Sequence, residues 1–248
     1  MSTFKVGITY FFNSGFVIET QKYCLIFDFY LEQARTEASS TGGNMIEDRL
    51  MQTGKKIFVF VSHSHADHFN PTIFQWQKQR IDINYILSSD IRIPGYAEIN
   101  RYGLNMIAPY EELELGKVKI KAYGSTDEGV SFLVKADGLT IFHAGDLNWW
   151  YWWDDSEEER KDAEHRFKNE IAKLKGEEID LAFFPVDPRL EHNFAAGGRY
   201  FIEELQPKVF IPMHFGEDYE IVDYFGEEVK HLETRVIKIN SSLQQIFL

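Results

Sequence analysis

The chain has 248 residues, of which 44% are hydrophobic, so it can bury a sizeable core. Its formal net charge of −13 repels polyanions, which disfavours broad nucleic-acid binding but leaves a small anionic substrate open. The first twenty residues lack a signal-peptide pattern, and no stretch is apolar over the ~18 residues of a membrane helix. Cys24 is the only cysteine, which excludes an intrachain disulfide, and its apolar neighbours predict a core position. We therefore expect a cytoplasmic protein with no membrane contact, and its oligomeric state stays open.

Apolar runs rich in β-branched and aromatic residues predict strands in the first half of the chain. These runs cover residues 5–10, 15–20, 23–29, 57–61 and 83–87. The polar stretch 31–54 predicts a loop with a short helix over 45–51, a candidate lid. Asn70 as N-cap and Pro71 in the first turn predict a helix to about residue 79.

In the second half, residues 117–122 alternate strictly and predict a half-buried strand with a solvated lysine face. Ser156 and Glu159 form a capping box that starts a helix, which Gly176 can end. The other predicted elements are a hairpin over 130–135 and 139–143, strands over 180–186, 209–212, 235–239 and 244–248, and helices over 198–205 and 220–230. This order predicts two packed sheets with helices outside, and we treat residues 1–248 as a single domain.

Four potential metal ligands follow the predicted strand 57–61 within six residues, namely His63, His65, Asp67 and His68. Imidazole and carboxylate together suit zinc and its first-row neighbours. The two alternating histidines can share one face of an extended segment, and Asp67 and His68 can turn toward a second ion. A histidine-rich polar turn is the alternative, and the tight spacing of mixed ligand types argues against it.

Further potential ligands stand at the ends of other predicted strands: Asp28, Asp146 in Ala-Gly-Asp, and His214 in Pro-Met-His-Phe-Gly. Because sheets bring strand ends together, these side chains can converge at one edge. With the six-residue motif and the opening residues 13–16, Asn-Ser-Gly-Phe, they resemble the metallo-β-lactamase-fold hydrolases over nearly the whole chain. The chain is most similar to the subgroup that contains the ascorbate-6-phosphate lactonases.

The resemblance implies an α/β (α+β) fold, an αββα four-layer sandwich with its site at one edge of both sheets. It implies two divalent metal ions, with zinc the first choice and manganese or iron the alternatives. The ligands it assigns are His63 and His65 for the first ion, Asp67, His68 and His214 for the second, and Asp146 between them. Asp28 would orient the loop of residues 63–68 without binding an ion itself.

The region before residues 130–135 departs from the family pattern, because it lacks the histidine that usually completes the first metal site. Asp127 or Thr126 could supply an oxygen ligand instead, which would favour harder ions such as manganese. His143 and His192 are further candidates, with a core position and a surface position as their respective alternatives.

The chemistry that this ligand set implies is hydrolysis, because paired divalent ions acidify a bridging water near neutral pH. Asp67 would orient the nucleophile, and His214, His192 or a metal-bound water would protonate the leaving group. The sequence therefore predicts a metal-dependent hydrolase of a small-molecule ester, lactone or phosphorylated substrate. The alternatives are a phosphodiesterase or nuclease, which the acidic balance disfavours, and a metal-binding protein with little turnover.

Five aromatic residues, 149–153, come soon after Asp146. They could wall a pocket for apolar or ring-shaped ligands, or cover core surface before the helix at Ser156. Arg189, Arg199 and Lys208 could hold an anionic group, with a plain surface role as the alternative.

Overall fold

The computed structural model describes residues 6–30, 52–93 and 103–248. It divides into two compact units, Met1–Ile107 with Ser242–Leu248, and Ala108–Ser241. The helix predicted over 45–51 lies outside the described residues, as does most of the loop around it. That residues 1–248 act as a single domain stays a prediction.

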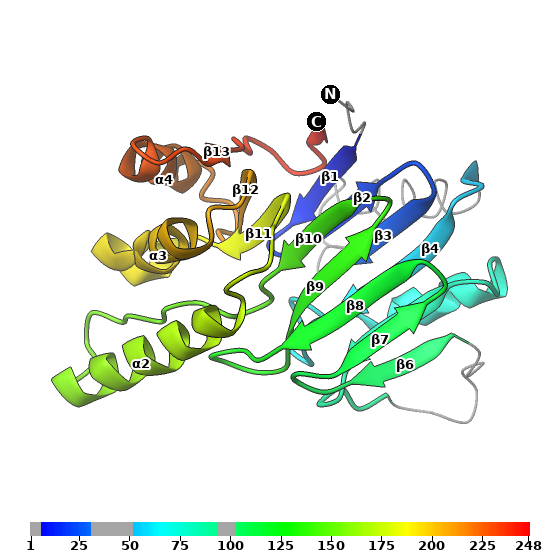
Figure 1. Ribbon diagram of the computed structural model, residues 1–248, viewed down its shortest axis with the longest axis horizontal. Helices are drawn as coiled ribbons and strands as arrows, with labels where there is room; N and C mark the ends of the chain where they lie inside the picture. Colours follow the sequence, from blue (N-terminus) through cyan, green and yellow to red (C-terminus); the bar gives the residue numbers. More distant parts are fainter. Residues whose placement is uncertain (1–5, 31–51, 94–102) are drawn as a thin grey trace. The chain divides into compact units, whose positions relative to one another are not determined.

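The described part of the first unit contains one mixed seven-stranded sheet (Figure 1). Its strands are, in spatial order, β14 (Gln245–Phe247), β1 (Gly7–Phe12), β2 (Gly15–Glu19), β3 (Tyr23–Phe27), β4 (Lys56–Val61), β5 (Asn84–Ser88) and β6 (Leu104–Ile107). β3 to β6 are parallel neighbours, whereas β14, β1, β2 and β3 pair antiparallel. The 3-10 helix η1 (Pro71–Lys78) packs Trp76 against Phe29, with ring centroids 4.9 Å apart.

The second unit contains another mixed seven-stranded sheet. Its strands are, in spatial order, β13 (Arg235–Val236), β12 (Val209–Met213), β11 (Leu181–Pro185), β10 (Leu139–His143), β9 (Ser131–Ala136), β8 (Val118–Tyr123) and β7 (Glu112–Leu115). β10 to β13 are parallel, and the pairings from β7 to β10 are antiparallel.

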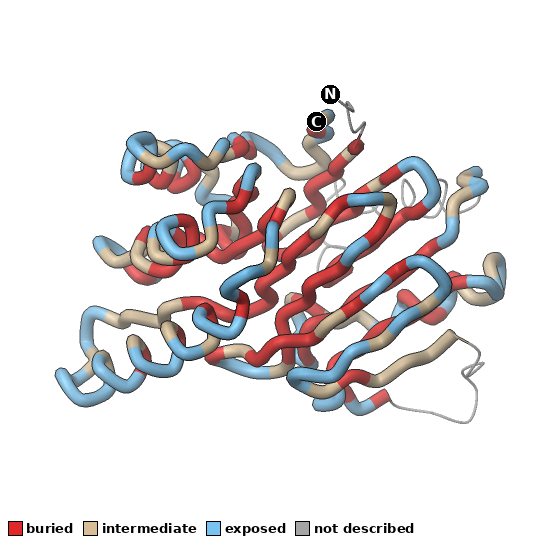
Figure 2. The backbone as a smooth tube through the Cα atoms, in the orientation of Figure 1, coloured by how far each residue is buried: buried red, intermediate tan, exposed pale blue. Residues whose placement is uncertain are grey.

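Helices α2 (Glu157–Lys173), α3 (Ala196–Leu205) and α4 (Glu220–Val229) lie beside the sheet of the second unit (Figure 1). They pack on it through aromatic side chains. Phe184 of β11 contacts Phe167 of α2 and Phe201 of α3, and Phe210 of β12 stacks on Phe225 of α4. Figure 2 shows the strands mostly buried and the helices exposed on one side, which is the amphipathic pattern of surface helices. No helix in the described ranges has both the length and the apolar character to cross a membrane.

Most predicted elements are present, with ends within a few residues of the predicted ones. The segment after Pro71 is 3-10 rather than α-helical, although Asn70 caps it as predicted by accepting from the Thr72 amide. β6 and β7 were not predicted. β7 is short and charged, and it pairs its Glu112 with Lys121 of β8 at 3.4 Å. Part of the predicted solvated lysine face therefore faces glutamates across the strand pair.

The capping box of α2 provides a test of how firmly this helix begins. Ser156 accepts from the Glu159 amide at 3.3 Å, and the Glu159 carboxylate accepts from the Ser156 amide at 2.8 Å. We expect Ser156→Ala to lower the free energy of unfolding by about 1 kcal/mol, measured by urea denaturation. Ser156→Asp keeps an N-cap acceptor and is the matched control. Equal loss in both variants would contradict the capping role.

Candidate metal centre

The loop after β4 carries the four predicted ligands of the first unit. His63 and His68 are fully buried, His65 is exposed, and the Asp67 side chain is 41% exposed. A buried imidazole needs partners for both ring nitrogens, so the contacts of His63 and His68 decide what each nitrogen can do.

Asp28 holds this loop from the end of the neighbouring parallel strand β3. Its fully buried carboxylate accepts from the Ser62 amide and from the Ser62 hydroxyl, each at 2.7 Å. The same carboxylate lies 2.7 Å from His68 Nδ1. This is the role that the resemblance assigns to Asp28, orienting the loop of residues 63–68.

With Asp28 ionised, the contacts around Ser62 also favour one tautomer of His63. An ionised carboxylate only accepts, so the single Ser62 hydroxyl hydrogen goes to Asp28. Ser62 Oγ must then accept from His63 Nδ1, which lies 2.9 Å away. Asp28 thus accepts the Nδ1 hydrogen of His68 directly. It orients the Nδ1 hydrogen of His63 indirectly, through the Ser62 hydroxyl. In both rings Nε2 is left as the basic nitrogen, which is the form that binds a metal ion.

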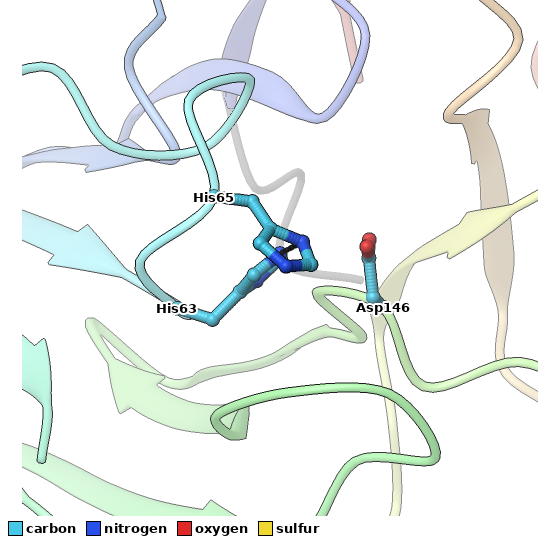
Figure 3. A group of neighbouring side chains, drawn as sticks. All are labelled: His63, His65 and Asp146. Carbon is cyan, nitrogen blue, oxygen red and sulfur yellow. Dashed lines mark hydrogen bonds between the residues drawn. The ribbon is translucent and has the colours of Figure 1, made fainter. Parts of the chain in front are cut away.

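The basic nitrogens of this loop face other potential ligands of the same unit. His63 Nε2 lies 3.1 Å from His65 Nδ1, a contact drawn in Figure 3, and His68 Nε2 lies 3.4 Å from Asp67 Oδ2. Asn13, in a left-handed turn conformation with φ 51°, donates to Asp67 Oδ2 at 2.9 Å and limits where that carboxylate can point.

In the second unit, Asp146 follows β10 and His214 follows β12 (Figure 3 draws Asp146). Both side chains are 6% exposed, and His214 Nε2 lies 3.3 Å from Asp146 Oδ1. His214 has a left-handed backbone conformation, with φ 65°, at the point where the chain leaves the strand.

Asp187 is a candidate site residue that the sequence analysis does not single out. It follows β11, is 1% exposed, and lies with Oδ2 3.0 Å from His214 Nδ1. Burial disfavours its ionised form, but hydrogen bonds from His214 and Arg189 hold its pKa below the usual value. Asp187 comes after a buried strand, as Asp28 does. This position in the sequence is the signal that could have identified it as a site residue.

These donor atoms fit a divalent metal ion of the zinc class. Two ligands at about 2.1 Å from a tetrahedral ion are about 3.4 Å apart. Three separations within the units have this size. They are 3.1 Å between His63 Nε2 and His65 Nδ1, 3.3 Å between His214 Nε2 and Asp146 Oδ1, and 3.4 Å between His68 Nε2 and Asp67 Oδ2. His68 and His214 each place Nδ1 on a buried carboxylate, as histidine ligands of metal ions usually do.

Comparison with solved structures agrees with this architecture. The metallo-β-lactamase-fold protein YhfI of Bacillus subtilis aligns with a TM-score of 0.63 at 13% identity, over 99% of this chain and 100% of YhfI. Igni18, a metallo hydrolase of the archaeon Ignicoccus hospitalis, aligns with a TM-score of 0.62 at 16% identity, over 98% of both chains. The chain has the metallo-β-lactamase fold. The predicted fold class is confirmed, with two mixed sheets and flanking helices.

The fold by itself does not define the reaction. CmlA, a diiron β-hydroxylase of Streptomyces venezuelae, also aligns, with a TM-score of 0.61 at 13% identity over all of this chain and 54% of CmlA. A metallo-β-lactamase fold is therefore compatible with more than one class of metal chemistry, and sequence relatives are needed to separate them.

Sequence relatives point to hydrolases. The chain is 26% identical over 220 residues to a UPF0173 metal-dependent hydrolase of Pyrococcus furiosus, covering 85% of this chain and 84% of the relative. It is 27% identical over 228 residues to one of Bacillus velezensis, covering 84% of each. No family model matches the chain. The chain is thus similar in sequence to UPF0173 metal-dependent hydrolases.

The candidates for the missing histidine of this metallo-β-lactamase fold differ in how they are placed. Thr126 is buried and its hydroxyl is engaged by the Asn148 backbone, donating to its oxygen at 2.6 Å and accepting from its amide at 3.0 Å. Asp127 is exposed, as is His192 in η2 (Pro188–Asn193). His143 is fully buried at the end of β10, where its Nδ1 accepts from the Gly145 amide. Thr126 thus braces the segment that carries Asp146.

The three cationic side chains considered for anion binding also differ. Lys208 pairs with Asp180 at 2.6 Å, and the Arg199–Glu228 pair is 3.8 Å long. Both pairs are on the surface of the second unit. Arg189 instead donates to the buried Asp187 carboxylate, which places it beside His214.

Ser62 and Ser64 offer a matched test of the hydrogen-bond chain from Asp28 to His63. We expect Ser62→Ala to weaken Zn²⁺ binding about tenfold or more, because His63 loses the acceptor that fixes its Nδ1 hydrogen. The measurement is competition with a chromophoric chelator. Ser64→Ala is the control, since Ser64 is exposed two residues away. Equal affinities for the two variants would show that the chain is not required.

Asp187 can be tested in the same assay. Asp187→Asn keeps the size of the side chain but removes its charge, so we expect about 10–100-fold weaker Zn²⁺ binding. Asp223→Asn is the control, because it makes the same change at Asp223 of α4, which forms an exposed ion pair with Lys238. Thermal unfolding of both variants without metal separates a loss of folding from a loss of affinity. Wild-type affinity in Asp187→Asn would exclude the orienting role.

Proposed function

We propose that this chain is a metal-dependent hydrolase that uses metal-activated water on a small-molecule ester, lactone or phosphorylated substrate. The observation that carries the proposal is that a buried carboxylate orients a candidate histidine ligand in each unit, Asp28 with His68 and Asp187 with His214. The relatives named metal-dependent hydrolases support it. We also propose that the chain is a member of the UPF0173 family, in the lactonase-like part of the superfamily.

The proposed centre is binuclear. As the family resemblance implies, His63 and His65 would hold one ion, and Asp67, His68 and His214 would hold the other. Asp146 would lie between the two ions. Zinc is our first choice because imidazole nitrogens dominate the donor set, with manganese or iron as alternatives.

When bound, divalent ions at such a centre lower the pKa of a water molecule and polarise the attacked carbonyl or phosphoryl oxygen. The side chains around them have the positioning roles. Asp67, held by Asn13, orients the attacking water through its carboxylate. His214, held by Asp187, is the candidate proton donor to the leaving group when it is not engaged as a ligand. Cys24 is a buried core residue and has no part in this scheme.

The charge of the chain supports a small substrate. A net charge of −13 opposes long-range attraction of nucleic acid, so a nuclease is the weaker candidate. A metal-binding protein with little turnover is the other alternative, because the usual third histidine of the first site is absent. Both alternatives are resolved by measuring bound metal and turnover together.

We expect His65→Ala and Asp146→Ala each to reduce the bound metal and to lower hydrolysis at least about 100-fold, since each removes a ligand. Metal per folded chain is measured by mass spectrometry after loading with Zn²⁺ or Mn²⁺. Turnover is measured on chromogenic esters, lactones, phosphomonoesters and phosphodiesters.

His165→Ala is the matched control, because His165 is an exposed histidine of α2. Unchanged metal content and turnover in the His65 and Asp146 variants would show that the site is wrongly assigned. Full metal loading with no turnover on any substrate would favour the non-catalytic alternative, and turnover confined to phosphodiesters would favour the nuclease.

A further inference from the structure

The aromatic run 149–153 has two faces with different partners. Trp149 and Tyr151 stack with centroids 5.8 Å apart and planes 9° from parallel. Trp149 also contacts Phe167 of α2 at 6.1 Å and Tyr200 of α3 at 6.3 Å. Trp149 therefore packs on the helices of the second unit, and Tyr151 is contacted by Arg160 of α2. This is the packing role considered for the whole run.

Trp150 and Trp152 form a second stack, with centroids 5.8 Å apart and planes 7° from parallel. Trp150 contacts the His214 ring edge-to-face at 5.7 Å, and its indole nitrogen donates to the Asp146 backbone oxygen at 3.1 Å. The stack is thus attached to both candidate metal ligands of this unit.

The guanidinium of Arg189 lies over the Trp152 ring, 5.8 Å from its centroid. The same guanidinium donates to both oxygens of Asp187, each at 3.0 Å from Nε. Its charge is therefore largely balanced by a carboxylate, and the surface beside Trp152 is closer to neutral than an arginine alone would make it.

Both indoles of the second stack are only partly buried, so part of each ring system is exposed beside its contacts with Arg189 and His214. The exposed parts of two nearly parallel indoles offer a rigid, apolar surface. A planar ring covers such a surface without freezing rotatable bonds, whereas an alkyl chain loses conformational entropy when it is bound. The near-neutral surroundings disfavour an anionic group as the main partner of the stack.

We propose that Trp150 and Trp152 form a substrate subsite that stacks on a planar, aromatic ring next to the hydrolysed bond. The subsite rests on the proposed function, because it borders His214 and Asp146, and it narrows the substrate to ring-bearing esters, lactones or phosphorylated compounds. Trp152 is the specificity-determining residue, since Trp150 is already held by its contacts with His214 and Asp146.

The test compares two phosphonates on the Zn²⁺-loaded full chain by isothermal titration calorimetry. Phenylphosphonate carries an anionic head and a ring, and methylphosphonate carries the same head without the ring. We expect phenylphosphonate to bind about tenfold more tightly, the size of one aromatic stacking contact. Trp152→Leu should abolish this preference, and Trp152→Phe, which keeps a planar ring, should retain most of it.

Trp153→Leu is the matched control, because Trp153 is the neighbouring residue and is 57% exposed. It should keep the wild-type preference. Equal affinity of the wild type for both phosphonates would overturn the ring subsite and leave the metal centre standing. Failure of the chain to load with Zn²⁺ would overturn the metal centre and the subsite with it, and binding of neither phosphonate to the loaded chain would overturn the subsite alone. The subsite would also be overturned if Trp152→Leu still bound phenylphosphonate more tightly than methylphosphonate and Trp152→Phe were folded.

Discussion

A buried carboxylate is the constraint on which the first unit's candidate site depends. Removing an ionised carboxylate from water costs several kcal/mol unless donors replace the lost hydration. Asp28 obtains them from Ser62, through amide and hydroxyl, and from His68. Those donors exist in place only when β3 and β4 lie side by side in parallel, so the sheet pairing and the histidine geometry are formed together.

The second unit repeats this arrangement with different residues. Asp187 follows β11 and holds His214, which follows the parallel neighbour β12. In both units an aspartate after one strand orients a histidine after the next. The strand ends also carry left-handed backbone at Asp28, with φ 41°, and at His214, with φ 65°. Such strain persists where surrounding contacts determine the conformation, and it is common at functional sites.

Much of the fold could be predicted from the sequence because buried strands and a capping box leave local patterns. The strand ahead of His63 and the helix after Ser156 are examples. β7 was missed because a short run of alternating glutamate and leucine becomes a strand only through its pairing with the lysines of β8. The role of Asp187 could not be predicted either, since it depends on a histidine 27 positions away in the chain. The two faces of the aromatic run follow from packing on α2 and α3, which no local pattern shows.

The alternation within that run has an evolutionary consequence. Trp149 and Tyr151 are tied to the helices, whereas Trp150 and Trp152 are tied to the ligand side of the same segment. Substitutions at successive positions therefore have separate effects, one pair acting on the packing of the helices and the other on the proposed subsite. Exchange of Trp152 would alter the proposed subsite while Trp149 keeps its packing on α2 and α3. The segment is therefore a place where specificity can drift without first requiring a compensating change in stability.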